Sequence, residues 1–188
     1  LIEVPESVSI ERVSDSLSRL GSVLEVKWTE INKPFDKLFF PVHFYGDRVV
    51  FFTSSMFHAM IKEVSDLVTE AGEEILFYRK GAAMASVLYE RFLRYLRSVD
   101  DKLAFMEDLL RAFGWCTIEF LKVKPGGRVS SIKVYESMES SSPAKVKCHF
   151  LRGFLTEILR RVYGDFFIDL EECKCRSMGD QYCEFKVK

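Results

Sequence analysis

Cysteine is the residue type with the clearest chemistry in this chain of 188 residues, because its cysteines gather near one end. Residues 148–188 contain Cys148, Cys173, Cys175 and Cys183, and Cys116 lies outside this segment in an apolar stretch typical of a core. Clustered cysteines without a secretion signal are more often metal ligands than disulfides. We predict zinc, since it binds thiolates in tetrahedral geometry. The alternatives are small buried apolar residues or a disulfide formed on oxidation.

The elements around the cysteines predict that three of them meet. Residues 172–185 are typical of a hairpin with a tight turn at Gly179-Asp180, which places Cys175 near Cys183. Cys148 comes at the start of an amphipathic helix, where the helix dipole favours a negative ligand.

The identity of a fourth ligand depends on how regular the strand before Cys175 is. In a regular strand Cys173 and Cys175 point to one face and Glu172 points to the other, which favours four cysteines. A bulge would reverse this and favour Glu172.

The segment resembles the V4R (4-vinyl reductase) domain family, whose ending has Glu, Cys, Gly, Cys and an aromatic residue at fixed spacings. This chain matches them with Glu172, Cys175, Gly179, Cys183 and Phe185. Its run 148–154 also resembles that family's entry into a long helix. The family is similar in fold to TRAPP-type trafficking subunits and to sensor domains of phenol-responsive activators, in which three Cys and one Glu hold zinc. The resemblance therefore implies a structural zinc ion with four ligands, Cys148, Glu172, Cys175 and Cys183.

Hydrophobic periodicity predicts an α+β fold, with an antiparallel sheet, packed helices, and a C-terminal helix and hairpin joined by the metal site. The predicted helices cover residues 9–20, 54–72, 73–97, 103–113 and 150–163. The predicted strands cover residues 24–28, 38–45, 48–53, 115–123, 129–135, 166–170 and 182–187. Residues 137–142 are Ser-rich and predicted to be a flexible loop. We divide the chain into an N-terminal helix-strand extension, 1–32, and a V4R-like ligand-binding domain, 33–188.

Aromatic residues are abundant, with 17 Phe, 7 Tyr and 2 Trp. Six of them come from elements that are expected to converge: Phe113, Trp115, Phe120, Tyr135, Phe150 and Phe154. We predict that they line a pocket for a hydrocarbon, aromatic or tetrapyrrole-like molecule, with Trp115 and Tyr135 as polar handles. The alternative is that they are ordinary core residues.

These features predict a small-molecule-binding or sensor domain, in which a fully ligated metal is structural and no residue is catalytic. An alternative is a dimeric interaction scaffold resembling the trafficking subunits, with a dimer face at the small residues of Gly81–Ala85. An enzyme or accessory in tetrapyrrole vinyl reduction ranks last, because no cofactor motif supports it.

Charge and hydropathy restrict the partners. With 27 basic and 28 acidic residues, the net charge of −1 gives no overall attraction to nucleic acid. Apolar stretches such as residues 38–45 are interrupted well before the ~20 residues that a membrane-spanning helix needs. We therefore predict a cytoplasmic protein whose partners are an apolar ligand and a second copy of the chain.

Overall fold

A computed structural model describes residues 9–21, 26, 43–44, 46–50, 52–124, 126–140 and 147–188. The chain divides into two compact units, Leu1–Phe51 and Phe52–Lys188. The predicted boundary after residue 32 falls outside the described residues and stays a prediction.

The described residues of the first unit form one helix and one short antiparallel strand pair. Helix α1 (Ile10–Ser18) confirms the helix predicted from residue 9. Strands β1 (His43–Phe44) and β2 (Asp47–Arg48) pair across Gly46, whose φ of 85° suits a residue without a side chain. The strand predicted over residues 48–53 is therefore wrong beyond Arg48, where the pairing ends.

The second unit contains helices α2 (Ser54–Leu67), α3 (Glu70–Arg91), α4 (Val99–Ala112) and α5 (His149–Tyr163). The first three of these helices begin directly after Thr53, Thr69 and Ser98. Each of these side chains accepts a hydrogen bond from a backbone N–H of the first turn. None of the helices in the described ranges is long and apolar enough to cross a membrane.

Its four-stranded sheet has the order β3-β4-β6-β5 and is antiparallel throughout. The strands are β3 (Thr117–Lys122), β4 (Val129–Tyr135), β5 (Leu170–Lys174) and β6 (Cys183–Val187). The predicted α+β class is confirmed. The strand predicted over 166–170 is wrong before Leu170, where β5 begins, because the chain turns where Asp165 accepts a hydrogen bond from the N–H of Phe167 at 3.1 Å.

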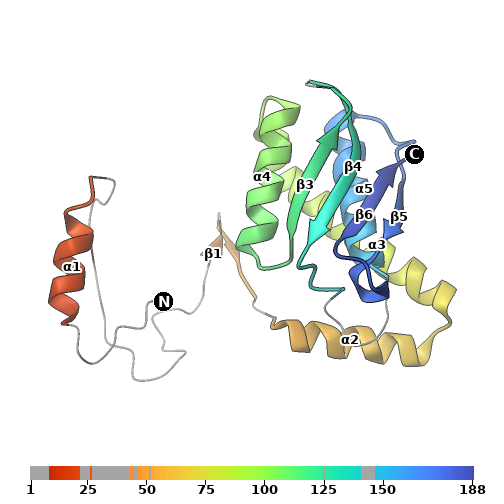
Figure 1. Cartoon of the computed structure of the whole chain (residues 1–188), viewed down its shortest axis with the longest axis horizontal. Helices are drawn as coiled ribbons and strands as arrows, with labels where there is room; N and C mark the ends of the chain where they lie inside the picture. Colours follow the sequence, from red (N-terminus) through yellow and green to blue (C-terminus); the bar gives the residue numbers. More distant parts are fainter. Residues whose placement is uncertain are drawn as a thin grey trace. The chain divides into compact units, whose positions relative to one another are not determined.

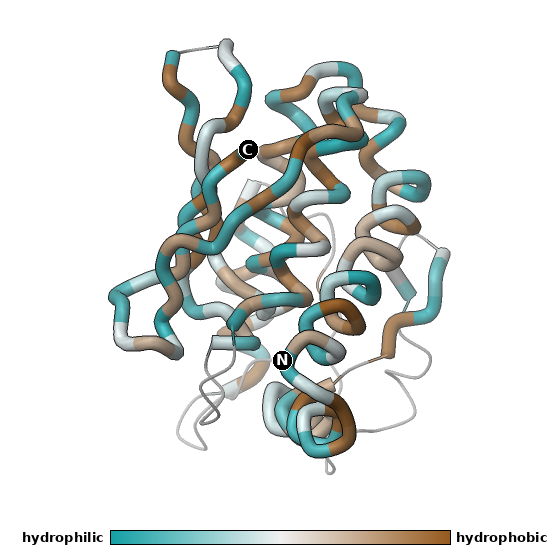
Figure 2. The backbone as a smooth tube through the Cα atoms, turned by 90° about the vertical axis from the view of Figure 1, so that its right-hand side faces the viewer, coloured by the Kyte–Doolittle hydropathy of each residue, from teal (hydrophilic) through white to brown (hydrophobic). Residues whose placement is uncertain are grey.

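Helix α5 lies against one face of the sheet, and α3 packs on α5 (Figure 1). Hydrophobic and hydrophilic residues alternate along the strands (Figure 2). The buried side chains of Ile132 and Val134 therefore share the inner face of β4, whereas Lys133 and Tyr135 share the outer face.

The α3–α5 crossing brings two glycines together. A Cβ atom added to Gly81 would lie 2.0 Å from the Phe150 carbonyl oxygen, and one added to Gly153 would lie 2.0 Å from the Tyr78 carbonyl oxygen. Gly81 and Ala85 are buried in this crossing. These two residues are therefore used inside the chain, whereas Ala83 and Met84 of the predicted dimer face are exposed, and the dimer itself stays a prediction.

Candidate metal centre and aromatic cluster

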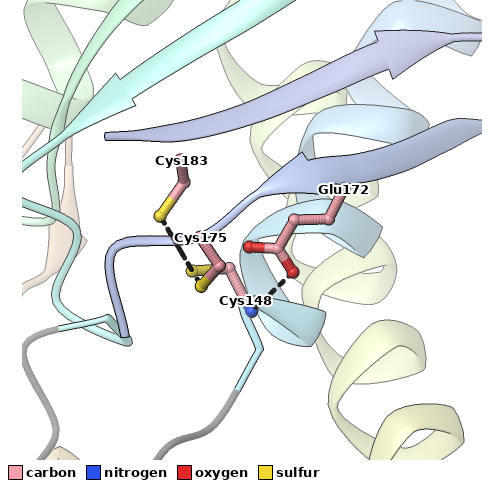
Figure 3. Close-up of side chains that lie close together, drawn as sticks. All are labelled: Cys148, Glu172, Cys175 and Cys183. Atoms are coloured by element: carbon pink, nitrogen blue, oxygen red, sulfur yellow. Dashed lines mark hydrogen bonds between the residues drawn. The ribbon is translucent and has the colours of Figure 1, made fainter. Parts of the chain in front are cut away.

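Cys148, Glu172, Cys175 and Cys183 converge at the end of the sheet nearest the start of α5 (Figure 3). Their potential ligand atoms all lie within 4.8 Å of one another. The Sγ atom of Cys183 is 3.7 Å from that of Cys148 and 3.9 Å from that of Cys175. Tetrahedral zinc with Zn–S bonds of about 2.3 Å separates its sulfur ligands by about 3.8 Å. The sulfur positions therefore fit a zinc ion.

Three elements position these four donors. Cys148 is the N-cap residue of α5, Cys175 directly follows β5, and Cys183 begins β6. The predicted convergence of the three cysteines is thus found in the structure.

A β-bulge decides which neighbour joins them. Glu172 is paired with Phe185, and Lys174 is paired with Glu184, so Cys173 is an extra residue between two consecutive partners. The bulge leaves Cys173 exposed and brings Glu172 to the cluster.

The two carboxylate oxygens of Glu172 differ in their hydrogen bonds to the described residues. Its Oε2 atom accepts a hydrogen bond from the Cys148 N–H at 3.1 Å. Its Oε1 atom is buried and has no hydrogen-bond partner within the described part of the chain. Such orphaned buried atoms are rare, and a metal ion at the thiol cluster would satisfy this one.

The electrostatics of the cluster favour a cation. Hydrogen bonds with Cys148 and Cys175 hold the pKa of the Cys183 thiol far below its usual range. Hydrogen bonds with Cys175 and Cys183, together with burial, raise the pKa of Cys148. Burial raises the pKa of Glu172 to about 8. Once one group of this cluster is ionised, ionising a second is therefore unfavourable. A divalent cation bound among the four residues would offset their negative charges.

Further polar groups contact each of the three sulfur atoms. The Ser177 Oγ is 3.1 Å from the Cys175 Sγ, and the Arg176 N–H donates to the Cys183 Sγ at 3.4 Å. The Ser137 Oγ lies 3.7 Å from the Cys148 Sγ. Such contacts orient metal ligands and tune their basicity.

Four of the six predicted pocket residues form one contiguous group. The Trp115 ring centroid lies 5.6 Å from that of Phe150, 5.4 Å from that of Phe154 and 6.2 Å from that of Phe113. Phe57 of α2 joins through Phe150 at 5.9 Å. We call these five residues the aromatic cluster.

The other two predicted residues lie apart from the cluster. Phe120 shares the inner face of β3 with Ile118, and within the described residues its ring contacts none of the cluster rings. Tyr135 is on the outer face of the sheet, where its ring packs against Tyr182 at 5.6 Å. The structure therefore does not bring Tyr135 to the cluster.

Two surface cavities also lie outside the aromatic cluster. One of about 490 Å³ lies between α3 and α5 beside Tyr78, Arg79 and Arg152. One of about 260 Å³ lies beside Tyr163 and Phe167.

Residues 131–188 match the V4R domain, and this segment contains all four candidate metal ligands. The resemblance to the V4R family is confirmed for this segment. No curated protein matches the chain.

Solved structures extend the likeness in fold beyond the V4R segment. The phenol-responsive sensory domain of the transcription activator PoxR, in a crystal structure with phenol, is 19% identical with a TM-score of 0.59. The match covers 76% of this chain and 78% of that one. A vinyl-4-reductase family protein from Methanocaldococcus jannaschii is 17% identical with a TM-score of 0.53, over 74% of this chain and 83% of that one.

The sequence did not predict that Phe57 of α2 belongs to the aromatic cluster. This residue lies outside the V4R segment. Phe57, Ile61 and Val64 follow helical spacing and pack with Phe77 and Phe150. That spacing identifies one face of α2 but not the surface it covers, because the contact partners are distant in the chain.

Proposed function

We propose that this chain binds a small apolar or aromatic molecule as a sensor domain, and that a structural zinc ion fastens α5 to the final hairpin. The observation that carries this proposal is the aromatic cluster, which packs on the first two turns of the helix that begins at Cys148. The likeness in fold to a phenol-responsive sensory domain supports it.

The donor set argues for zinc in a structural role. Three thiolates and one carboxylate form a four-coordinate set, in which no position is open to water or substrate. Thiolate ligands select zinc over hard cations such as Mg²⁺ and Ca²⁺. An enzymatic role for the metal is therefore disfavoured.

The aromatic cluster suits a planar ligand for two reasons. Trp115 meets Phe150 and Phe154 edge to face, at interplanar angles of 67° and 69°, whereas the rings of Phe150 and Phe154 stack at 21°. An added ring would therefore find both faces and edges to pack against. Phe57 and Trp115 are only partly buried, so the cluster reaches solvent at these two rings. Among hydrocarbons, single-ring aromatics and tetrapyrrole-like molecules, a single ring requires the smallest opening.

The test is titration with phenol, followed by Trp115 fluorescence. The chain has two tryptophans, so a Trp28→Phe background leaves Trp115 as the reporter. We expect saturable quenching, and roughly tenfold weaker binding in Phe154→Leu, because one aromatic contact contributes up to about 1.5 kcal/mol. Phe167→Leu is the matched control, since Phe167 is 95% exposed. Quenching that never saturates, or equal weakening by both variants, would contradict phenol binding at this cluster.

A second candidate is a dimeric interaction module. Exposed apolar side chains on α3, including Ile75, Met84 and Val87, favour it. Native mass measurement distinguishes the two functions: a dimer that takes up no phenol favours the scaffold. Location in the cytoplasm stays a prediction.

A further inference from the structure

A short segment between β4 and α5, residues 137–140, is buried although its composition predicts a flexible loop. Ser137, Glu139 and Ser140 are 1%, 1% and 6% exposed. The segment is braced internally, because the N–H groups of Glu139 and Ser140 point to the Ser137 Oγ at 3.2 and 3.5 Å. Buried polar groups need partners, and this segment finds further partners in two different places.

The first place is the start of α5. The Glu139 carboxylate accepts hydrogen bonds from the N–H groups of Phe150 and Leu151 at 2.9 and 2.7 Å. The N-cap residue Cys148 makes no capping hydrogen bond with its own side chain. Glu139 therefore caps the helix from a distance, and this leaves the Cys148 thiol to the metal cluster.

The second place is the aromatic cluster and α2. The Met138 N–H donates to the Trp115 carbonyl oxygen at 2.8 Å, and the Met138 carbonyl oxygen accepts from the His58 Nε2 at 2.6 Å. The Met138 side chain packs against the core of Ile61, Phe77 and Phe150. Adjacent residues of this buried segment thus contact the aromatic cluster and the start of α5.

We infer that residues 137–140 couple the two sites, with Glu139 as a positioning residue for Cys148. This inference rests on the proposed function. A ligand in the aromatic cluster restrains Met138, which restrains the Glu139 cap and the first turn of α5, so Cys148 moves less and the metal leaves more slowly. Linkage requires the reverse as well: the factor by which a bound ligand raises the affinity for the metal is also the factor by which bound metal raises the affinity for the ligand.

The experiment measures metal release from the full chain with and without phenol. The chain is loaded with Co²⁺, and excess chelator is added while the thiolate-to-cobalt absorption is followed. Saturating phenol is expected to slow release at least about fivefold, at the low end of usual coupling between sites.

Two variants distinguish coupling between the two sites from a purely structural role of residues 137–140. In Glu139→Gln the amide nitrogen cannot accept a hydrogen bond, so one N–H of Phe150 or Leu151 loses its partner. We expect this variant to keep Co²⁺ and phenol but to lose most of the phenol effect and to show a changed cobalt spectrum. Glu119→Gln makes the same chemical change at an exposed position of β3 and should match the wild type. Met138→Ala leaves the Glu139 cap in place and should also lose the phenol effect, so it serves if Glu139→Gln fails to fold.

Each outcome is decisive. Unchanged release in wild type with phenol bound overturns the coupling but leaves the proposed function. A full phenol effect in Glu139→Gln or Met138→Ala overturns the role of residues 137–140. Phenol that does not quench Trp115 overturns the proposed function, and the coupling with it.

Discussion

Replacing Cys183 with alanine is expected to abolish metal binding and to lower the midpoint of thermal unfolding by roughly 10 °C. Cys183 is fully buried, and its sulfur atom lies 3.7 Å from that of Cys148 and 3.9 Å from that of Cys175. Its loss leaves two thiols and a carboxyl, a weak set for zinc. Structural zinc supplies folding free energy directly. A loss of about 4 kcal/mol corresponds to this change in midpoint for a chain of this size.

Cys173→Ala is the matched control for this prediction. Cys173 is two residues from Cys175, but the bulge leaves it exposed and outside the cluster. We expect its metal content, measured by elemental analysis, and its unfolding midpoint to equal those of the wild type. Loss of metal in Cys173→Ala would mean that β5 is regular and that the site has four cysteines. Retention of a full metal equivalent in Cys183→Ala would contradict the site altogether.

At the metal centre, local sequence patterns predict three of the four ligands but not the fourth. The turn between Cys175 and Cys183 and the helix after Cys148 are local signals, and they predict the three cysteines. Whether Glu172 or Cys173 completes the set depends on one extra residue in the pairing of β5 with β6. That register is fixed by contacts between two strands, so alternation within one strand cannot decide it. Only the family resemblance pointed to Glu172.

Among the aromatic residues, too, some positions follow from the sequence and others do not. Alternation with Ile132 and Val134, which are buried, places Tyr135 on the opposite face of β4, and this was predictable from the sequence. The apolar run at Phe166, in contrast, led to a wrong prediction. It is typical of a strand, yet Phe166 is 71% exposed, because the turn after Gly164 delays the start of β5 to Leu170. Most helices, in contrast, follow from periodicity that stays within one element.

Small residues on a helix predict that another segment packs closely against it, but they do not identify that segment. Gly81 suits contact with a second copy as well as contact with a helix of the same chain. Gly153 also lies in a helix, but its proximity to Gly81 arises only from the way α3 crosses α5.

Gly153→Ala is therefore expected to destabilise the chain by about 3 kcal/mol or more, at the upper end of the usual cost of overpacking. An added Cβ would lie 2.0 Å from the Tyr78 carbonyl oxygen, and backbone atoms cannot rotate away as a side chain can. Alanine is by itself favoured over glycine inside a helix by about 1 kcal/mol, so a net loss of stability must come from the clash.

The measurement is the free energy of unfolding from urea denaturation. Gly21→Ala is the control, because a Cβ there meets no atom within 4 Å, and its effect should stay within about 0.5 kcal/mol. The crossing also positions the helix that carries Cys148, Phe150 and Phe154. Gly153→Ala should therefore bind both Co²⁺ and phenol more weakly than Gly21→Ala does. An effect on stability below about 1 kcal/mol would mean that α3 and α5 separate at little cost, and the two candidate sites would then not share one rigid support.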